Sequence, residues 1–361
     1  MAHNIKTFKT TNSEVYLGND VFVLLNEYLF AYDKSKIFLL VDENTLNSCA
    51  TQLISHVKAL EKAEIIEIES GEESKTIDIC YQLWKTLADY NADRNSLLIN
   101  LGGGVISDMG GFVASTYKRG IDFINIPTTL LAQIDASVGG KVGVDLDGLK
   151  NMIGLFNEPK AVFIYPDFLK TLDKRQMLSG YAEALKHGLI LDKKYWNQLK
   201  KGMLSDSSFW LDMISTSVQL KNNIVLNDPT EKGERKLLNF GHTIGHAIET
   251  YYLSGDDLPL LHGEAIVIGM ICEAYISMKV NGLSEERLKE ITTTFSKFYK
   301  LPTLKMEEYH AVLELMKNDK KNTKSNLNFT LLTAIGSASI NHHIETELII
   351  DAFDFYNTIY S

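Results

Sequence analysis

The sequence predicts two domains: an α/β domain with a Rossmann-like parallel sheet over residues 1–170, and a mainly α-helical domain over residues 171–361. The first half alternates short, β-branched apolar runs with helical stretches, which is typical of parallel strands covered by helices. After about residue 170, apolar residues recur at helical spacing instead. The chain has 361 residues, which is long enough for two domains that each bury a core.

Five segments of the first half are predicted to be strands, because each is a short apolar run bounded by turn residues. They are 36–45, 63–72, 96–104, 121–129 and 161–167. Parallel sheets bind their ligands beyond the carboxyl ends of the strands. The unusual residues of this sequence lie at those ends: Asp42 and Asn44, Gly71 and Glu72, Gly102 to Gly104, and Pro127 to Thr129.

The second half contains five stretches with helical periodicity. They begin with DKRQMLSG, FWLDMIST, KLLNFGHT, GEAIVIGM and SEERLKEI. Neither an internal repeat nor a low-complexity segment interrupts them. The boundary between the two domains is expected between Pro159 and Gly180.

The composition disfavours several classes of protein. A net charge of −10 opposes nonspecific binding to nucleic acid or to an anionic membrane. The first 20 residues lack the apolar core of a signal peptide, and no apolar run approaches the roughly 20 residues that span a bilayer. Cys49, Cys80 and Cys272 form no C-x-x-C pair, so we expect buried apolar side chains. We predict a cytoplasmic protein in which any anionic ligand meets a local cluster of cations.

A glycine-rich turn joins the third predicted strand to a helix in LLINLGGGVISDMGGF, residues 97–112. Backbone N–H groups of such a turn can approach a pyrophosphate closely, because no side chain intervenes. The spacing differs from the G-x-G-x-x-G fingerprint, and Asp42 precedes the glycines instead of following them. The turn therefore fits either a nucleotide site or a merely tight strand-to-helix connection.

The following stretch, residues 119–156, contains Asp135, a Gly-Gly-Lys turn that ends at Lys141, and the pair Lys150 and Asn151. A lysine beside glycines lets an ammonium group and backbone N–H groups converge on one phosphate or carboxylate. The alternative for each lysine is a solvated surface charge.

Histidines are concentrated in the helical half. His242 and His246, in LLNFGHTIGHAIE, share one helix face because they are four residues apart. This is not the H-E-x-x-H motif of metallopeptidases, since threonine follows the first histidine. Together with His262, or with the carboxylate of Glu183, they could form a catalytic zinc site. Spacing leaves the ligand set open, because Glu183 and His187 are also four apart, and packed or surface roles are equally possible.

These segments together resemble the 3-dehydroquinate synthase family, within the sugar phosphate cyclases, from about Asp42 to Lys321. The motifs that carry the resemblance are GGGVISDMGGF, RGIDFINIPTTLLAQIDASVGGKVGV, LKNMIGLF, GYAEALKHGLI, GERKLLNFGHTIGHAIE and LLHGEAIVIGM. The resemblance implies a dehydroquinate synthase-like fold. It also implies a metal ion, Zn²⁺ or Co²⁺, held by Glu183, His242 and His262, with His246 acting on the substrate and His187 having no ligand role.

The resemblance implies further site residues. NAD would contact Asp42, Asn44, Glu72, Lys75, Gly103, Gly104, Asp108, Thr128, Thr129 and Thr171, with Lys141 and Lys150 nearby. The substrate would contact Asp135, Lys141, Lys150, Asn151, Lys186, Lys221, Arg235, Asn239 and His246. Either Lys320 or Lys321 would add a contact. Arg119 would come from a neighbouring subunit, which implies a homodimer. One departure is visible, because Asp145 stands where family members often have asparagine.

The implied activity is conversion of 3-deoxy-D-arabino-heptulosonate 7-phosphate to 3-dehydroquinate and phosphate, a lyase step of the shikimate pathway to chorismate and the aromatic amino acids. It would proceed by transient NAD-dependent oxidation, phosphate elimination, re-reduction and intramolecular aldol closure. The alternatives are a sibling sugar phosphate cyclase, a metal- and NAD-dependent polyol dehydrogenase, and a catalytically silent regulator. Retention of Arg235, Asn239 and His246 disfavours the sibling, and the many cations disfavour the dehydrogenase.

Overall fold

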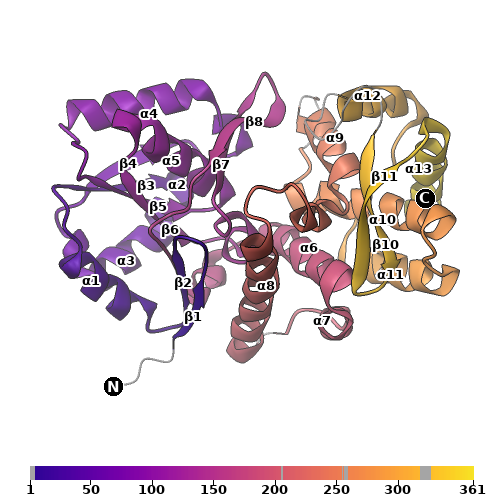
Figure 1. Ribbon diagram of the computed structural model, residues 1–361, viewed down its shortest axis with the longest axis horizontal. Coiled ribbons are helices and arrows are strands. Elements are labelled where there is room, and N and C mark those ends of the chain that lie inside the picture. The colour runs from indigo at the N-terminus through magenta and orange to yellow at the C-terminus, as the bar shows by residue number, and fades with distance from the viewer. Residues whose placement is uncertain (1–4, 205, 254, 256–258, 318–326) are drawn as a thin grey trace. The chain divides into compact units, whose positions relative to one another are not determined.

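A computed structural model describes residues 5–204, 206–253, 255, 259–317 and 327–361. It divides into two compact units, Met1–Asp173 with Asp206–Leu226, and Lys174–Ser205 with Asn227–Ser361 (Figure 1). Helix α8 (Ser207–Asn227) thus lies almost entirely in the first unit, although a boundary at residue 170 would place it in the second. The Asn222 side chain donates to the Lys9 carbonyl at 2.8 Å. Helical periodicity identifies such a helix but does not say against which unit it packs.

A seven-stranded sheet of order β1-β2-β9-β6-β5-β3-β4 forms the first unit. All five expected strands are present and pair in parallel: β3 (Ile37–Asp42), β4 (Glu64–Ile68), β5 (Leu97–Gly102), β6 (Asp122–Pro127) and β9 (Ala161–Ile164). The Rossmann-like α/β prediction is therefore confirmed. Two short strands extend the sheet beyond β9: β1 (Lys6–Lys9) and β2 (Glu14–Leu17). With four residues each, they are too short to show a reliable period in the sequence.

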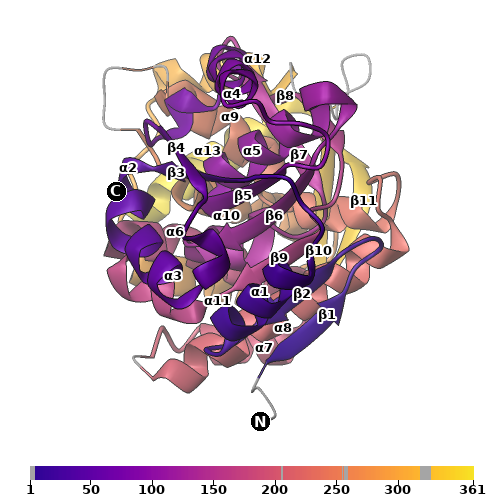
Figure 2. The ribbon, with the colours of Figure 1, turned by 90° about the vertical axis from the view of Figure 1, so that its left-hand side faces the viewer.

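Both faces of the sheet are covered by helices (Figure 2). Alternate residues of β3 enter two cores, with Leu39 and Val41 in one and Phe38 and Leu40 in the other. The first core includes residues of α1 (Val21–Ala31) and α3 (Thr51–His56), and the second includes residues of α4 (Ile77–Asp89) and α5 (Gly104–Thr116). Burial on both faces explains why the strands read as continuous apolar runs.

Two adjacent glycines bring α5 close to its neighbours on both sides. A Cβ atom on Gly110 would lie 2.0 Å from Oδ1 of Asn100 in β5. One on Gly111 would lie 2.4 Å from Cγ1 of Val142. The MGGF segment therefore fixes this helix, whose first turn follows the glycine-rich loop, against the sheet.

A hairpin of β7 (Lys141–Leu146) and β8 (Leu149–Phe156) packs on α5 and was not among the expected strands. Its tip uses Asp147 and Gly148 in the left-handed region, at φ 50° and φ 80°. Shorter elements connect the strands and helices of this unit: α2 (Glu43–Thr45), π-helical turns Leu46–Ala50 and Ala132–Ala136, and 3₁₀ turns Lys58–Leu60, Glu72–Ser74, Tyr117–Arg119 and Pro166–Thr171.

Helices dominate the second unit, as the sequence predicts. They are α6 (Lys174–Leu191), α7 (Lys193–Leu199), α9 (His242–Leu253), α10 (His262–Val280), α11 (Glu285–Phe298), α12 (Met306–Lys317) and α13 (Thr346–Tyr360), with a 3₁₀ turn at Glu234–Asn239. One antiparallel hairpin accompanies them, β10 (Asn328–Ala334) with β11 (Ser337–His343). Helix α10 is buried on nearly all sides and packs against α6, α9 and α13.

Cys49, Cys80 and Cys272 are all buried and unbridged, as expected. None of the helices in the described part of the chain combines the length and the apolar character needed to cross a bilayer.

Candidate functional site

The expected cofactor residues of the first unit lie at the carboxyl ends of its parallel strands. Asp42 ends β3, where its carboxylate accepts the backbone N–H of Thr45 at 2.8 Å and caps α2. Gly103 follows β5, and a Cβ atom there would lie 3.0 Å from the Thr129 side chain. The buried hydroxyl of Thr128 has no hydrogen-bond partner among the described residues. Exposed Asn44 follows Asp42, Gly104 begins α5, and Thr171 ends the 3₁₀ turn after β9.

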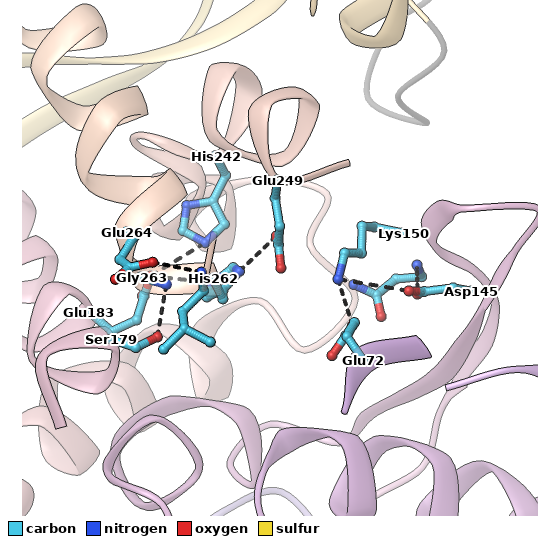
Figure 3. A network of polar contacts seen from close by, with 12 residues as sticks. Glu72, Asp145, Lys150, Ser179, Glu183, His242, Glu249, His262, Gly263 and Glu264 are labelled. Atoms are coloured by element: carbon cyan, nitrogen blue, oxygen red, sulfur yellow. Dashed lines mark hydrogen bonds and ion pairs between the residues drawn. The ribbon is translucent and has the colours of Figure 1, made fainter. Parts of the chain in front are cut away.

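A network of charged side chains lies in the same unit. The Lys75 ammonium group is 2.7 Å from the Asp108 carboxylate, 2.8 Å from Oδ1 of Asn151 and 3.7 Å from the Glu72 carboxylate. Lys150 is 2.7 Å from the same Glu72 oxygen (Figure 3). Burial alone would lower the pKa of Lys75, but the neighbouring carboxylates outweigh it and raise that pKa. Lys75 is therefore charged and held in place at neutral pH.

Asp145 supplies a third carboxylate to this network. It is 3.8 Å from the Lys150 ammonium group, and it accepts the backbone N–H of Asn151, which has a left-handed φ of 52°, at 2.7 Å. Burial raises the pKa of Asp145 and of Asp108. The expected cluster of cations is thus accompanied by carboxylates here, which the lysine motifs alone did not indicate.

Four more predicted residues belong to this unit: Asp135, Lys141, Lys221 and Arg119. Lys221 of α8 is 2.8 Å from the Asp135 carboxylate, and Lys141 is exposed at the start of β7. Arg119 follows the far end of α5, about 20 Å along the helix from its first residue.

The second unit brings four predicted side chains together from three helices. Figure 3 shows Glu183, His242 and His262. Oε1 of Glu183, on α6, is 3.6 Å from Nε2 of His242 on α9 and 3.7 Å from Nε2 of His262 on α10. Nitrogen atoms of His242, His246 and His262 also lie within 4.8 Å of one another. Tetrahedral zinc with bonds of about 2.0–2.1 Å holds its ligand atoms roughly 3.3 Å apart. The geometry fits a metal centre built on Glu183, His242 and His262, and His246 lies close enough to compete.

Both histidines that face Glu183 have their other ring nitrogen occupied. Nδ1 of His242 is 3.0 Å from the Phe240 carbonyl, and Nδ1 of His262 is 3.0 Å from the Glu249 carboxylate. Burial alone would lower the pKa of His262, but Glu249 and Glu183 raise it to about 10. A cation that binds Nε2 of His262 at neutral pH therefore displaces a proton.

Glycines set the close packing that brings these helices together. A Cβ atom on Gly263 would lie 2.0 Å from the Ser179 carbonyl, so α10 begins in direct contact with α6. A Cβ atom on Gly269 would lie 2.0 Å from the Gly241 carbonyl, at the start of α9. The fully buried carboxylate of Glu273 accepts the backbone N–H of Gly241 at 2.6 Å and thereby caps α9. His242 and His262 thus each begin a tightly held helix.

Other predicted substrate residues of this unit lie in or near the same helices. Buried Lys186 forms an ion pair with Glu183 on α6. Arg235 is 2% exposed, and its guanidinium group donates to the Pro229 carbonyl at 2.8 Å. The Asn239 side chain donates to Glu231 at 2.7 Å. His187 is buried but does not belong to the group of three histidines. Lys320 and Lys321 lie outside the described residues.

Sequence reasoning assigned no role to several carboxylates that organise these sites. Glu249 holds His262, Glu273 caps α9, and Asp228 accepts three backbone N–H groups of residues 232–235, at 3.0, 2.7 and 3.1 Å. For Glu249 a signal existed, because it lies three residues after His246 and therefore on the same helix face. Glu273 and Asp228 act through backbone groups, which leave no sequence pattern.

Two family models match adjacent parts of the chain: the N-terminal domain of 3-dehydroquinate synthase over residues 65–179 and its C-terminal domain over residues 180–322. A protein named 3-dehydroquinate synthase from Parabacteroides distasonis is 42% identical over 349 residues, covering 96% of this chain and 98% of that protein. The chain belongs to the 3-dehydroquinate synthase family. A family member of the same name from Clostridium botulinum is also 42% identical, over 87% of this chain and 90% of its own.

Solved structures agree with the fold of this 3-dehydroquinate synthase family member. A 2-deoxy-scyllo-inosose synthase crystallised with carbaglucose-6-phosphate, NAD⁺ and Co²⁺ has a TM-score of 0.86 at 24% identity, covering 97% of this chain and 99% of its own. An iron-containing alcohol dehydrogenase has a TM-score of 0.67 at 16% identity, covering 97% and 98%. These likenesses concern the fold, and the choice among activities rests on the sequence relatives.

Proposed function

We propose that the protein is a 3-dehydroquinate synthase, which converts 3-deoxy-D-arabino-heptulosonate 7-phosphate to 3-dehydroquinate and phosphate. The observation that carries the proposal is the grouping, in one unit, of a metal-type ligand set with buried Lys186 and Arg235. Identity of 42% to a protein of that name, over nearly the whole chain, supports it. The substrate carries a phosphate and a carboxylate, and buried cations bind such groups strongly.

Glu183, His242 and His262 are proposed to hold the divalent ion, Zn²⁺ or Co²⁺. Two imidazoles and one carboxylate with a position left for substrate are the donor set of a catalytic zinc site. When bound, the ion supplies Lewis-acid polarisation of a substrate hydroxyl. His246, beside this set on the same helix, is proposed to hydrogen-bond the substrate and to move a proton.

The strand ends of the first unit are proposed to hold NAD, which supplies a hydride acceptor and donor when bound. Gly103 and Gly104 permit close approach of a pyrophosphate to the start of α5. The buried Thr128 hydroxyl and the Lys75 network offer polar contacts beside them. Further proposed contacts are Asp42, Asn44, Glu72, Asp108, Thr129, Lys141, Lys150 and Thr171.

The substrate is proposed to contact cations and amides of the chain. Lys186, Arg235 and Asn239 bind its anionic and hydroxyl groups, together with Asp135, Lys141, Lys150, Asn151, Lys221, His246 and either Lys320 or Lys321. Lysine and arginine at these positions would supply the local positive charge that a chain of net charge −10 needs for an anionic substrate.

A panel of substrates tests the proposal against its alternatives. The purified protein, supplied with NAD⁺ and Zn²⁺, should release phosphate from 3-deoxy-D-arabino-heptulosonate 7-phosphate and give 3-dehydroquinate by NMR. Glucose 6-phosphate, which lacks the carboxylate, should not react. A carbocycle formed only from glucose 6-phosphate would indicate a sibling cyclase. Net NADH formed from glycerol would indicate a polyol dehydrogenase.

We also propose a cytoplasmic homodimer in which Arg119 serves the neighbouring subunit. Lys118, Arg119 and Gly120 all have positive φ, at 49°, 70° and 112°. Non-glycine residues in this region cost about 1–3 kcal/mol, and such strain is common at functional positions. Exposed Arg119 is thus displayed on a strained turn directly after α5.

Arg119→Ala should lower turnover by about a hundredfold or more, because a charge-assisted contact to the substrate is lost, and NAD⁺ affinity should stay unchanged. A mixture tests the assignment to the neighbour. Co-expressed Arg119→Ala and His246→Ala chains should form dimers with one intact site and recover activity. If mixed dimers stay as inactive as either variant alone, Arg119 acts within its own chain.

A further inference from the structure

Glu249 stands out among the buried carboxylates of the second unit because it contacts a proposed metal ligand. Its side chain is 8% exposed, and Oε2 lies 3.0 Å from Nδ1 of His262 (Figure 3). The contact joins two helices, since Glu249 lies on α9 and His262 begins α10. Glu249 is not among the proposed metal, substrate or cofactor residues.

The direction of this contact decides which nitrogen of His262 faces the metal centre. A carboxylate only accepts hydrogen bonds, so Nδ1 of His262 must carry the hydrogen. Nε2 is then the ligand atom, and it lies on the side of Glu183, 3.7 Å from Oε1. His242 has the same arrangement, with the Phe240 carbonyl accepting from Nδ1 at 3.0 Å. The Phe240 carbonyl and the Glu249 carboxylate thus orient the two histidine rings so that both Nε2 atoms face Oε1 of Glu183.

The frame around Glu249 is rigid enough to hold a ring in place. Helix α9 is capped by Glu273 and approaches α10 through Gly241, Gly245 and Gly269. A Cβ atom on Gly245 would lie 2.8 Å from the Ile266 side chain and 3.1 Å from the Ala265 carbonyl, so little sliding is possible. His262 is the first residue of α10. At this position the rest of the helix does not fix the orientation of its side chain. The orientation of the His262 ring therefore depends on its partner on α9, Glu249.

We propose that Glu249 is a positioning residue, which orients the His262 ring and fixes its Nδ1–H tautomer so that Nε2 binds the divalent ion. The inference rests on the proposed ligand set Glu183, His242 and His262. Acceptors of this kind commonly orient metal-bound histidines, and their removal weakens metal binding by about 10–100-fold.

Two variants separate the acceptor from the bulk of the side chain. Glu249→Met keeps the length but removes the acceptor, so it should weaken Co²⁺ binding by about 100-fold, measured by competition with a chromophoric chelator. Glu249→Gln keeps an acceptor but can also donate, which allows either tautomer, so it should lose about tenfold. The visible absorption band of bound Co²⁺ should change in position or intensity in both.

Glu308→Gln is the matched control. Glu308 is a buried carboxylate of the same unit that accepts the backbone N–H of Lys305 at 2.8 Å and the Tyr252 hydroxyl at 3.5 Å, and no histidine among the described residues hydrogen-bonds to it. It should keep wild-type Co²⁺ affinity and spectrum even if its melting temperature falls. If Glu249→Met does not fold, the milder Glu249→Gln decides the question.

Wild-type affinity and spectrum in the Glu249 variants would overturn the inference. So would losses no larger than that of Glu308→Gln, since these would reflect stability alone. Failure of the ligand set gives a different result: His262→Ala would then bind Co²⁺ as tightly as the wild type. The two failures can therefore be told apart.

Discussion

Replacing His242 with alanine is expected to remove metal binding and nearly all turnover. Nε2 of His242 is 3.6 Å from Glu183 Oε1, and its ring is fixed through the Phe240 carbonyl, which suits its proposed role as a direct ligand. Removal of a residue that only hydrogen-bonds to a metal ligand weakens metal binding by up to about a hundredfold, so loss of the ligand itself should weaken Zn²⁺ binding by more than that. Turnover should fall by roughly a thousandfold, since Lewis-acid catalysis supplies several kcal/mol.

His246→Ala is the matched comparison, because His246 lies one turn further along α9 with its ring 5.0 Å from that of His242. The proposed ligand set predicts a variant that binds Zn²⁺ normally but turns over about 100-fold or more slowly, since a proton-transfer group is lost. Titration with a chelator and a turnover assay measure the two effects separately. If His246→Ala loses the metal while Glu183→Gln keeps it, the three histidines are the ligands instead.

Gly263→Ala should be the most disruptive single methyl group in the second unit. Its Cβ atom would lie 2.0 Å from the Ser179 carbonyl and 2.5 Å from Ser179 Cα, and backbone atoms cannot turn aside as a flexible side chain can. Overpacking costs about 1–3 kcal/mol and occasionally more. Helix α10 must move away from α6, and it carries His262 directly before the substituted position.

Thermal unfolding and Co²⁺ affinity measure this effect together. Gly263→Ala should lower the melting temperature by several degrees and also weaken Co²⁺ binding. Gly104→Ala is the control for stability, since its Cβ atom would be 3.6 Å from Ala136 and meet ordinary contact in a helix. Equal melting temperatures for the two variants would show that α6 and α10 are packed less closely at Gly263 than the structure indicates.

Much of the fold can be predicted from the sequence, because strands that are buried on both faces of a sheet consist mainly of consecutive apolar residues. The segments of β3, β5, β6 and β9 are mostly apolar, and the predicted strands end within a few residues of the observed ones. The hairpin β7–β8 was not, since its second strand alternates irregularly and lies partly exposed. Helix α8 shows the other limit: its periodicity was evident, but its place beside the first unit depends on long-range contacts such as that between Lys221 and Asp135.

The site divides in the same way. Spacing brought His242 and His246 to one face, but only the packing of three helices could set them against Glu183 and His262. The resemblance to a family, and not the spacing, singled out the ligand set. Neither the spacing nor the resemblance predicted the contacts of Asp145. Its carboxylate accepts the backbone N–H of the left-handed Asn151 and adds negative charge beside Lys150. These contacts form only when the β7–β8 hairpin is folded.

We propose that this one enzyme uses both a metal ion and a recycled NAD. The most direct test follows phosphate release from 3-deoxy-D-arabino-heptulosonate 7-phosphate together with absorbance at the NADH band. The protein should release many phosphates per bound NAD⁺ without net NADH, and release should stop when either NAD⁺ or the metal is removed and resume when both are restored. Phosphate release that continues without NAD⁺ or without metal, or NADH that accumulates in step with phosphate, would contradict the claim.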